Sequence, residues 1–237
     1  MQVWITGGGS GIGRALAEQL ILDGHSVCIS GRNKETLSAV SPEISAIPCD
    51  VSNPEDVQSA FTHMPPPELA ILNAGTYSPG PTHTASLEDF QQAMAVNYFG
   101  VINCLTALLP RMLEKGGHIA VVGSLAGYRG LPNASGYGPS KAAVISLCES
   151  MRAELAGSTV KFQLINPGFV KSPLTEKNDF EMPYLMEVEE AAEAILKGLR
   201  SDRFEIAFPT PFVRRMKFLR LLPYRFFFPL IQKVTRT

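Results

Sequence analysis

The chain has 237 residues, of which 45% are hydrophobic and 18% charged, and its formal net charge is −1. This length is typical of one α/β domain with a sizeable core, and the composition excludes a disordered or fibrous protein. The small net charge hides an asymmetry, because no acidic residue follows Glu205 whereas seven of the 21 basic residues do. Residues 1–205 therefore carry about −8 and the remaining residues about +7.

Short apolar runs rich in β-branched residues alternate with segments of helical period along the chain. We expect strands at 2–6, 26–30, 46–50, 69–75, 118–124, 160–168 and 204–208, and helices at 12–22, 34–39, 54–62, 86–109, 138–155 and 187–199. Asp23-Gly24 is typical of a helix end, and Ser86 with Asp89 is typical of a helix start. The alternation predicts βαβ units in an α/β fold, a single Rossmann-like doubly wound parallel sheet of about seven strands with helices on both faces.

The cysteines and the start of the chain bear on where the protein works. Cys28, Cys49, Cys104 and Cys148 are scattered, without the spacing of metal ligands, so we expect buried reduced thiols and no metal site. A strand begins at residue 3 with no basic segment before it, and we expect no apolar run long enough to span a membrane. These features predict a cytoplasmic protein.

A glycine-rich turn joins the first predicted strand to the first helix. Its five glycines leave no side chain where a pyrophosphate would approach the backbone, and the helix aims its first amide groups at that anion. The pattern is Thr-Gly-x-x-x-Gly-x-Gly, which is neither the general Gly-x-Gly-x-x-Gly fingerprint nor a P-loop. The alternative is an empty turn, but five glycines carry a stability cost that such turns seldom bear. We therefore predict a dinucleotide phosphate site formed by Thr6, Gly7, Gly9, Ser10, Gly11, Ile12 and Gly13.

The residue after the second strand bears on which dinucleotide binds. Folds that bind NAD place an Asp or Glu here to hold the ribose 2′-hydroxyl. This chain instead has Arg32, whose guanidinium can pair with a 2′-phosphate that a carboxylate would repel. We expect NADP(H) to be favoured over NAD(H), the alternative being an arginine on a solvated strand end.

Tyr137 and Lys141 are four residues apart and so share one face of a predicted helix. A phenol has a pKa of about 10, and a neighbouring ammonium group favours the phenolate and lowers that pKa toward neutrality. Such a pair alone is usually a surface feature. However, Ser124 stands thirteen residues upstream, at the end of a strand where ligands bind in such folds. Its position favours a catalytic interpretation of the pair.

The order and spacing of these motifs resemble the classical short-chain dehydrogenase/reductase family, from Val3 to about Phe208. The motifs are TGGGSGIG at 6–13, CDV at 49–51, LNAG at 72–75, Asn97, Ser124, YGPSK at 137–141 and NPG at 166–168. Leu72 replaces the first Asn of the family's Asn-Asn-Ala-Gly, a departure that we expect to be harmless. The resemblance implies a catalytic tetrad of Asn97, Ser124, Tyr137 and Lys141. It also implies cofactor contacts from Tyr137, Lys141, Asp50, Val51, Asn73, Ala74, Gly75, Pro167, Gly168, Val170 and Ser172.

The resemblance implies a chemistry as well. Tyr137 would give its proton to a carbonyl oxygen while a hydride reaches the carbon, and Ser124 would orient that oxygen. Lys141 would lower the Tyr137 pKa and hold the nicotinamide ribose, and Asn97 would anchor a water that links Lys141 to solvent. We expect an NADP-dependent oxidoreductase that interconverts a carbonyl and an alcohol, with reduction favoured. The alternative function is a non-catalytic NADP-binding regulator or scaffold.

The basic C-terminal segment is distinct from this domain, so we divide the chain into a catalytic NADP-binding domain at 1–208 and a tail at 209–237. A helical tail would carry Phe212 and Met216 on one face and Arg214 on the opposite one, but Pro223 and Pro229 prevent one continuous helix. The pattern suits either a peripheral contact with an anionic membrane or packing over the substrate cleft of the same chain or of a partner. Both arrangements indicate a hydrophobic small-molecule substrate. The resemblance further implies a homodimer or homotetramer, and we expect no nucleic-acid partner.

Overall fold

The computed structural model describes residues 1–234, so Arg236 of the basic tail lies outside the described residues. Seven strands pair in parallel in the order β3-β2-β1-β4-β5-β6-β7. Their bounds are β1 Gln2–Thr6, β2 Ser26–Gly31, β3 Ser45–Pro48, β4 Leu69–Leu72, β5 Gly117–Val122, β6 Val160–Pro167 and β7 Glu205–Phe208. The predicted doubly wound parallel sheet is confirmed. The strand order reverses between β1 and β4, which is where such sheets bind ligands.

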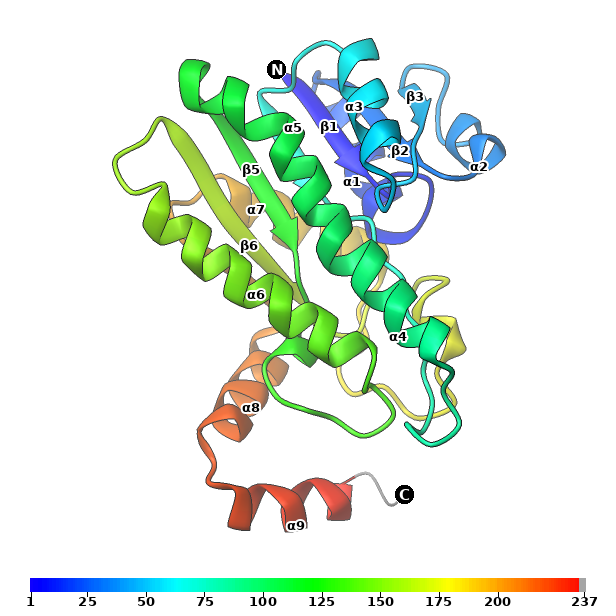
Figure 1. The fold of residues 1–237 in the computed structure, drawn as a ribbon, viewed down its shortest axis with the longest axis vertical. Helices are drawn as coiled ribbons and strands as arrows, with labels where there is room; N and C mark the ends of the chain where they lie inside the picture. The colour runs from blue at the N-terminus through cyan, green and yellow to red at the C-terminus, as the bar shows by residue number, and fades with distance from the viewer. Residues whose placement is uncertain (235–237) are drawn as a thin grey trace.

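Helices cover both faces of the sheet (Figure 1). One face carries α1 (Gly11–Leu22), α2 (Lys34–Ser38) and α7 (Val188–Leu199). The other carries α3 (Pro54–His63), α5 (Gly100–Lys115) and α6 (Tyr137–Glu154). The short α4 (Leu87–Met94) precedes α5 and packs against α6. Each predicted helix is present, with ends within one residue of the prediction except for the segment that contains α4 and α5.

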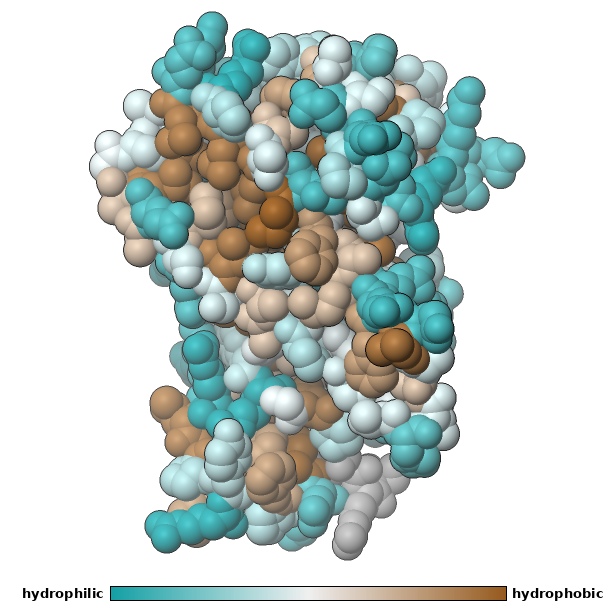
Figure 2. Space-filling model, viewed as in Figure 1, coloured by the Kyte–Doolittle hydropathy of each residue, from teal (hydrophilic) through white to brown (hydrophobic). Residues whose placement is uncertain are grey.

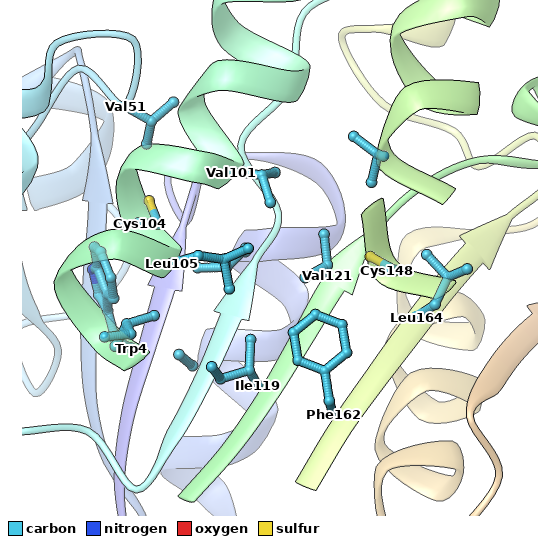
Figure 3. Close-up of a cluster of buried hydrophobic side chains, with 14 of the residues drawn as sticks. Trp4, Val51, Val101, Cys104, Leu105, Ile119, Val121, Cys148, Phe162 and Leu164 are labelled. Atoms are coloured by element: carbon cyan, nitrogen blue, oxygen red, sulfur yellow. The ribbon is translucent and has the colours of Figure 1, made fainter. Parts of the chain in front are cut away.

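A hydrophobic core lies on each side of the sheet because the strands are buried on both faces. Figure 3 shows part of the core beneath α5 and α6, which extends from Trp4 on β1, past Ile119 and Val121 on β5, to Phe162 on β6. All four cysteines are buried in this core, as predicted, and none forms a disulfide. The pKa of Cys28 is raised to about 11 by burial, as expected for an unreactive thiol.

The helix predicted at 86–109 extends instead to residue 115 and contains a five-residue π-helical turn, Ala95–Phe99. Pro110 is accommodated because it lies on the exposed side of α5, where water can replace the lost hydrogen bond. The continuous run Leu87–Lys115 is long and apolar enough to cross a membrane by length and composition, so the expectation of no such run was wrong. The apolar character of the run has a structural cause, because Cys104 and Leu108 of α5 are buried against the sheet.

The tail forms two helices, α8 (Thr210–Leu221) and α9 (Tyr224–Val234), which extend from one end of the domain (Figure 1). The break falls at Pro223, as predicted, whereas Pro229 lies inside α9 on its exposed side. Val213 and Met216 of α8 are buried against the domain. The first helix of the tail is therefore part of the folded body.

Trp4, the only tryptophan in the chain, reports on the core because it is fully buried in β1. Its indole Nε1 donates a hydrogen bond of 2.8 Å to Oγ of Ser30, which is also fully buried. Ser30→Ala leaves this donor unpaired, which costs about 1–3 kcal/mol of unfolding free energy. Urea unfolding followed by Trp4 fluorescence measures the loss. The exposed Ser38→Ala variant is the control, and an equal stability of the two variants would contradict the prediction.

Candidate active site

The carboxyl ends of the parallel strands meet around one cavity of about 190 Å³. Its lining includes Ile12 after β1, Asn73 after β4 and Ser124 after β5. Tyr137 and Lys141 of α6 also line it, as do Pro167 at the end of β6 and the segment that follows. Residues as far apart in the chain as Ile12 and Pro167 thus share one space, because the carboxyl ends of parallel strands meet at one edge of the sheet.

The glycine turn is packed so closely that side chains are excluded from it. A Cβ atom on Gly13 would lie 2.3 Å from the carbonyl oxygen of Gly7, and one on Gly7 would lie 2.8 Å from Cα of Ala74. Gly7 and Gly11 also have positive φ angles of 67° and 52°. Helix α1 starts at Gly11, and its N-cap Ser10 makes no side-chain capping bond, so its first amides are free for an anion. This narrow, amide-lined cradle fits a dinucleotide pyrophosphate.

The end of β1 is tied to the end of β4 beside this cradle. The buried Thr6 Oγ1 accepts hydrogen bonds from the backbone N–H groups of Asn73, at 3.0 Å, and Ala74, at 3.1 Å. The Asn73 Nδ2 donates to the carbonyls of Thr6 and Gly7, both at 3.1 Å. Thr6 and Asn73, predicted to contact a cofactor, therefore also hold the glycine turn in place.

Arg32, Asp50 and Val51, which were predicted to contact the cofactor, follow the carboxyl ends of β2 and β3. Arg32 follows β2 and is exposed, and its side chain has no hydrogen bond or ion pair among residues 1–234. Asp50 follows β3, and its Oδ1 accepts from the N–H and Oγ of Ser52 at 2.9 and 2.7 Å. Val51 is buried against Gly100 of α5. Leu72 is buried in β4, in the core, which accounts for an apolar residue at this position.

Ser124, Tyr137 and Lys141 lie together at one end of the cavity. The Lys141 Nζ is buried, donates to the carbonyl of Val122 at 2.8 Å and lies 5.8 Å from the centre of the Tyr137 ring. Burial lowers the pKa of Lys141 to about 8. Burial also raises the pKa of Tyr137 to about 12, which a hydrogen bond with Ser124 only partly counteracts. The expectation that Lys141 lowers the Tyr137 pKa is not met in this arrangement, because burial of the phenol dominates.

Asn97 is fully buried in the π-helical turn, and its side chain is already bonded. Its Oδ1 accepts from the N–H of Thr76 at 2.8 Å, and its Nδ2 donates to the Thr76 carbonyl and to Ser140 Oγ at 3.0 and 2.9 Å. The Oδ1 lies 3.3 Å from the position that a Cβ on Gly75 would take. The amide thus fixes the loop after β4 to α6, one residue before Lys141.

The segment after β6 folds back over the glycine turn. Ser172 Cβ lies 3.2 Å from the position that a Cβ on Gly11 would take, so the segment approaches the start of α1. The Ser172 N–H donates to Thr175 Oγ1 at 2.9 Å, and Thr175 Oγ1 donates to the Val170 carbonyl at 2.7 Å. Pro167, Gly168 and Val170 line the cavity between these two points. These predicted cofactor contacts therefore lie at the same cavity as the glycine turn and α6.

The tail helix that carries Phe212 and Met216 packs over the cavity, which confirms one of the two predicted arrangements of the tail, whereas the other cavity walls were not predicted. Tyr77 lies with its ring centre 4.9 Å from that of Tyr137, and its hydroxyl donates to Asn178 Oδ1 at 2.8 Å. Phe212 of α8 stacks on Phe169 at 5.5 Å between ring centres. The remaining walls are also mostly apolar, with Leu125, Leu131, Leu174, Phe180 and Met216. No sequence motif marks these residues, because they come together only when α8 and the loops fold over the sheet edge.

Glu205 was also missed, and it joins four elements beside the site. Its carboxylate accepts hydrogen bonds from Tyr128, which follows the Ser124 turn, from Asn166 Nδ2 at 2.8 Å, and from Lys217 Nζ of α8 at 2.5 Å. Burial opposes ionisation of this carboxyl, but the three donors outweigh burial and hold the pKa of Glu205 below its usual value. Glu205 therefore stabilises the position of α8 against the Ser124 turn.

Comparison with known proteins assigns the family. A model described as short chain dehydrogenase matches residues 1–182. The chain belongs to the short-chain dehydrogenase/reductase family of oxidoreductases, as the motifs indicated. An uncharacterized oxidoreductase of Myxococcus xanthus (strain DK1622) is 34% identical over 231 residues, which cover 92% of this chain and 91% of that protein.

Two solved structures show how closely the fold is shared. A short chain dehydrogenase from Burkholderia cenocepacia J2315, in complex with NADP, is 29% identical with a TM-score of 0.86, and the match covers 100% of this chain and 97% of that one. A short chain dehydrogenase/reductase from Burkholderia phymatum, in complex with NAD, is alike in fold at 24% identity, with a TM-score of 0.82 and 91% of each chain covered.

The hydrogen bonds that Glu205 accepts from Tyr128, Asn166 and Lys217 predict that the stability of the fold depends on pH. Glu205→Gln weakens the three hydrogen bonds and lowers the unfolding free energy at pH 7 by about 1–3 kcal/mol. Because the folded-state pKa of Glu205 is depressed, its contribution is present above the unfolded-state pKa of about 4.3 and is lost as pH falls through the folded-state value. The difference between wild type and variant should therefore shrink below about pH 4.3.

Urea unfolding at a series of pH values measures this difference. Glu18→Gln is the matched control, because Glu18 pairs only with Arg14 on the exposed side of α1 and should change stability by less than about 0.5 kcal/mol. A difference between wild type and Glu205→Gln that stays constant across the acidic range would contradict the assignment.

Proposed function

We propose that the protein is an NADPH-dependent carbonyl reductase with Tyr137 as the general acid. The observation that carries this proposal is the meeting of Tyr137, Ser124 and Lys141 in one largely apolar cavity next to the glycine cradle. The domain 1–208 would supply the chemistry, and α8 of the tail would complete the substrate cavity through Phe212 and Met216.

The protonation state of Tyr137 is the one that a general acid needs. With its pKa raised to about 12, the phenol keeps its proton at neutral pH and can donate it to a carbonyl oxygen. Ser124 shares a hydrogen bond with this phenol, so its hydroxyl can hold the same oxygen and orient it. A protonated phenol is the form that carbonyl reduction requires at the start of the reaction.

Lys141 and Asn97 would support the proton transfer. The Lys141 ammonium is held at the cavity by the Val122 carbonyl, from where it can bond the nicotinamide ribose and replace the proton that Tyr137 gives up. Because both N–H donors of the Asn97 amide are already used, a water linking Lys141 to solvent would bind the Asn97 main-chain carbonyl. Asn97 would then be a residue that positions this water.

The cofactor assignment rests on the cradle and on Arg32. When bound, NADPH supplies the hydride that the carbonyl carbon accepts. The cradle around Gly7 and Gly13 would hold its pyrophosphate, Asp50 and Val51 would lie near the adenine, and Asn73, Ala74 and Gly75 near the adenosine ribose. Since the fold is seen with both NADP and NAD, we base the choice of NADPH on the exposed Arg32, aided by the NADP of the more similar structure.

The cavity walls favour a hydrophobic substrate. Aromatic and aliphatic side chains from α8 and two loops surround the space next to Tyr137, so a bulky apolar ketone or aldehyde would be desolvated there. The test is the loss of NADPH absorbance with a panel of ketones and aldehydes of increasing apolar size. NADPH binding without turnover of any of them would support the alternative, a non-catalytic NADP-binding scaffold.

Tyr137→Phe tests the acid. Removing the hydroxyl should lower kcat by about 10²–10⁴-fold and leave the NADPH dissociation constant nearly unchanged. Steady-state kinetics with the best substrate and fluorescence titration with NADPH measure the two effects. Tyr77→Phe is the matched control, since it removes a neighbouring hydroxyl that bonds only Asn178 and should change kcat by less than about tenfold. Retained turnover in Tyr137→Phe would refute the acid role.

Arg32→Ala tests the choice of dinucleotide. Loss of a charge-assisted pairing with the 2′-phosphate should weaken NADPH binding by about 10–100-fold, and NADH binding should hardly change. Titration of wild type and variant with both dinucleotides measures the effect. Lys34→Ala, a neighbouring exposed cation, should have the smaller effect. Equal losses for NADPH and NADH in Arg32→Ala would exclude the 2′-phosphate assignment.

A further inference from the structure

The two C-terminal helices expose apolar side chains that the described part of the chain leaves uncovered. In α8, Phe218 and Leu221 are 59% and 81% exposed and point away from the face that carries the buried Val213 and Met216. Exposed apolar residues are common singly, but a cluster of them marks a surface that meets another apolar phase.

Helix α9 is apolar over a much wider arc than the domain can cover. The centre of this arc, Phe227 and Ile231, is buried. One flank carries Phe226 and Leu230, which are 54% and 38% exposed. The other flank is made of Tyr224 and Phe228, also exposed, whose rings stack at 5.6 Å. Each pair has the i, i+4 spacing of residues on one helix face. Helix α9 therefore packs on the domain through the centre of its apolar arc, and both flanks of the arc are exposed to solvent.

Arg129 joins the two tail helices to each other. The Arg129 guanidinium lies over the rings of Tyr224 and Phe227, at 4.6 and 4.5 Å from their centres. It also donates to the carbonyls of Arg220, at 3.3 Å, and Leu222, at 3.2 Å, at the junction of α8 and α9. These contacts fix the angle between the two helices, so the exposed apolar residues form a preformed surface.

The charges of this surface have one sign. No acidic residue follows Glu205 in the sequence. Among residues 1–234, two cations of the tail form ion pairs, Lys217 with Glu205 and, at 4.0 Å, Arg220 with Glu149. Two more lie over aromatic rings, Arg215 over Tyr184 at 5.0 Å and Arg225 over Phe226 at 4.7 Å. Among residues 1–234, the side chains of Arg214, Arg225 and Lys233 form no ion pair. They lie among the exposed apolar residues, and Figure 2 shows hydrophilic and hydrophobic patches side by side over this end of the molecule.

We propose that α8 and α9 form a docking surface for the interface of an anionic phospholipid bilayer. Phe218, Leu221 and the flanks of α9 would enter the boundary between headgroups and acyl chains, while Arg214 and Arg225 would bind lipid phosphates. A second copy of this chain fits less well, because a symmetric pairing through this surface would bring two strongly basic tails together. The inner face of α8 lines the cavity, so docking would place the cavity next to the bilayer.

Flotation of the full-length protein with phospholipid vesicles tests the proposal. The protein should float with vesicles that contain phosphatidylglycerol, much less with pure phosphatidylcholine, and less as the salt concentration rises. The apolar variant Phe226→Ser/Leu230→Ser and the charge variant Arg214→Glu/Arg225→Glu should each lower the partition coefficient by about tenfold or more.

Matched variants elsewhere on the surface control for general effects. Leu22→Ser/Leu87→Ser removes two exposed leucines, which are 80% and 66% exposed, and Arg111→Glu/Lys197→Glu reverses two exposed charges. Both should float like the wild type. Unchanged circular dichroism and thermal unfolding would show that the tail variants fold. Turnover of NADPH with a water-soluble ketone, measured without vesicles, should be the same in the wild type and in every variant. This activity assay tests the proposed reductase function independently of membrane binding.

Three results would overturn the proposal. The first is equal flotation with neutral and anionic vesicles, and the second is the absence of flotation by a folded wild type. The third is a dimer in light scattering that is lost in Phe226→Ser/Leu230→Ser, together with no flotation, which would make a second copy the occupant.

Discussion

The parallel pairing of β1 with β4, at the point where the strand order reverses, is the constraint on which the rest of the structure depends. It brings the glycine turn beside the Asn73 loop, and Thr6 locks the two together with hydrogen bonds. The register of β5 and β6 then places Ser124 and Pro167 at the same edge. Helix α6 adds Tyr137 and Lys141 because it packs across β6 on the face that α5 shares. One edge of the sheet thus collects side chains from five separate parts of the chain.

Burial gives the candidate site its chemical character. A phenol and an ammonium group in the same low-dielectric space both shift toward their neutral forms, so the Tyr137 pKa rises while that of Lys141 falls. The polar groups that must be buried beside them are nearly all paired, as Asn97 is with Thr76 and Ser140. One exception within residues 1–234 is the buried Oδ1 of Asn166, next to Gly123 after β5. The site therefore combines a rigid polar frame with a mostly apolar cavity.

The two helices of the tail have a buried inner face and an exposed outer face. Its inner face belongs to the domain, because Phe212 and Met216 close the cavity and Lys217 is bonded to Glu205. Of the two alternatives that the sequence left open, packing over the cleft is observed for α8, and the proposed membrane contact would use the outer sides of α8 and α9. Only one side of α8, and only the centre of the apolar face of α9, is buried. The outer sides of both helices are therefore exposed and can form a second surface. A basic, aromatic outer surface next to an apolar cavity is a coherent arrangement for a hydrophobic substrate.

The sequence by itself determined the fold class, the family, the glycine turn and the residues that meet in the cavity, because these features depend on local periodicity and on fixed spacings of unusual residue types. It also located the break at Pro223, since proline acts on its own backbone. Only the tertiary structure decided the cavity walls, the role of Glu205 and the raised pKa of Tyr137. Each of these depends on contacts between segments far apart in the chain, such as Phe169 with Phe212, or on the degree of burial that those contacts create. The π-helical turn at Asn97 and the continuation of α5 past Pro110 belong to the same group, because packing on the sheet overrides local propensity there.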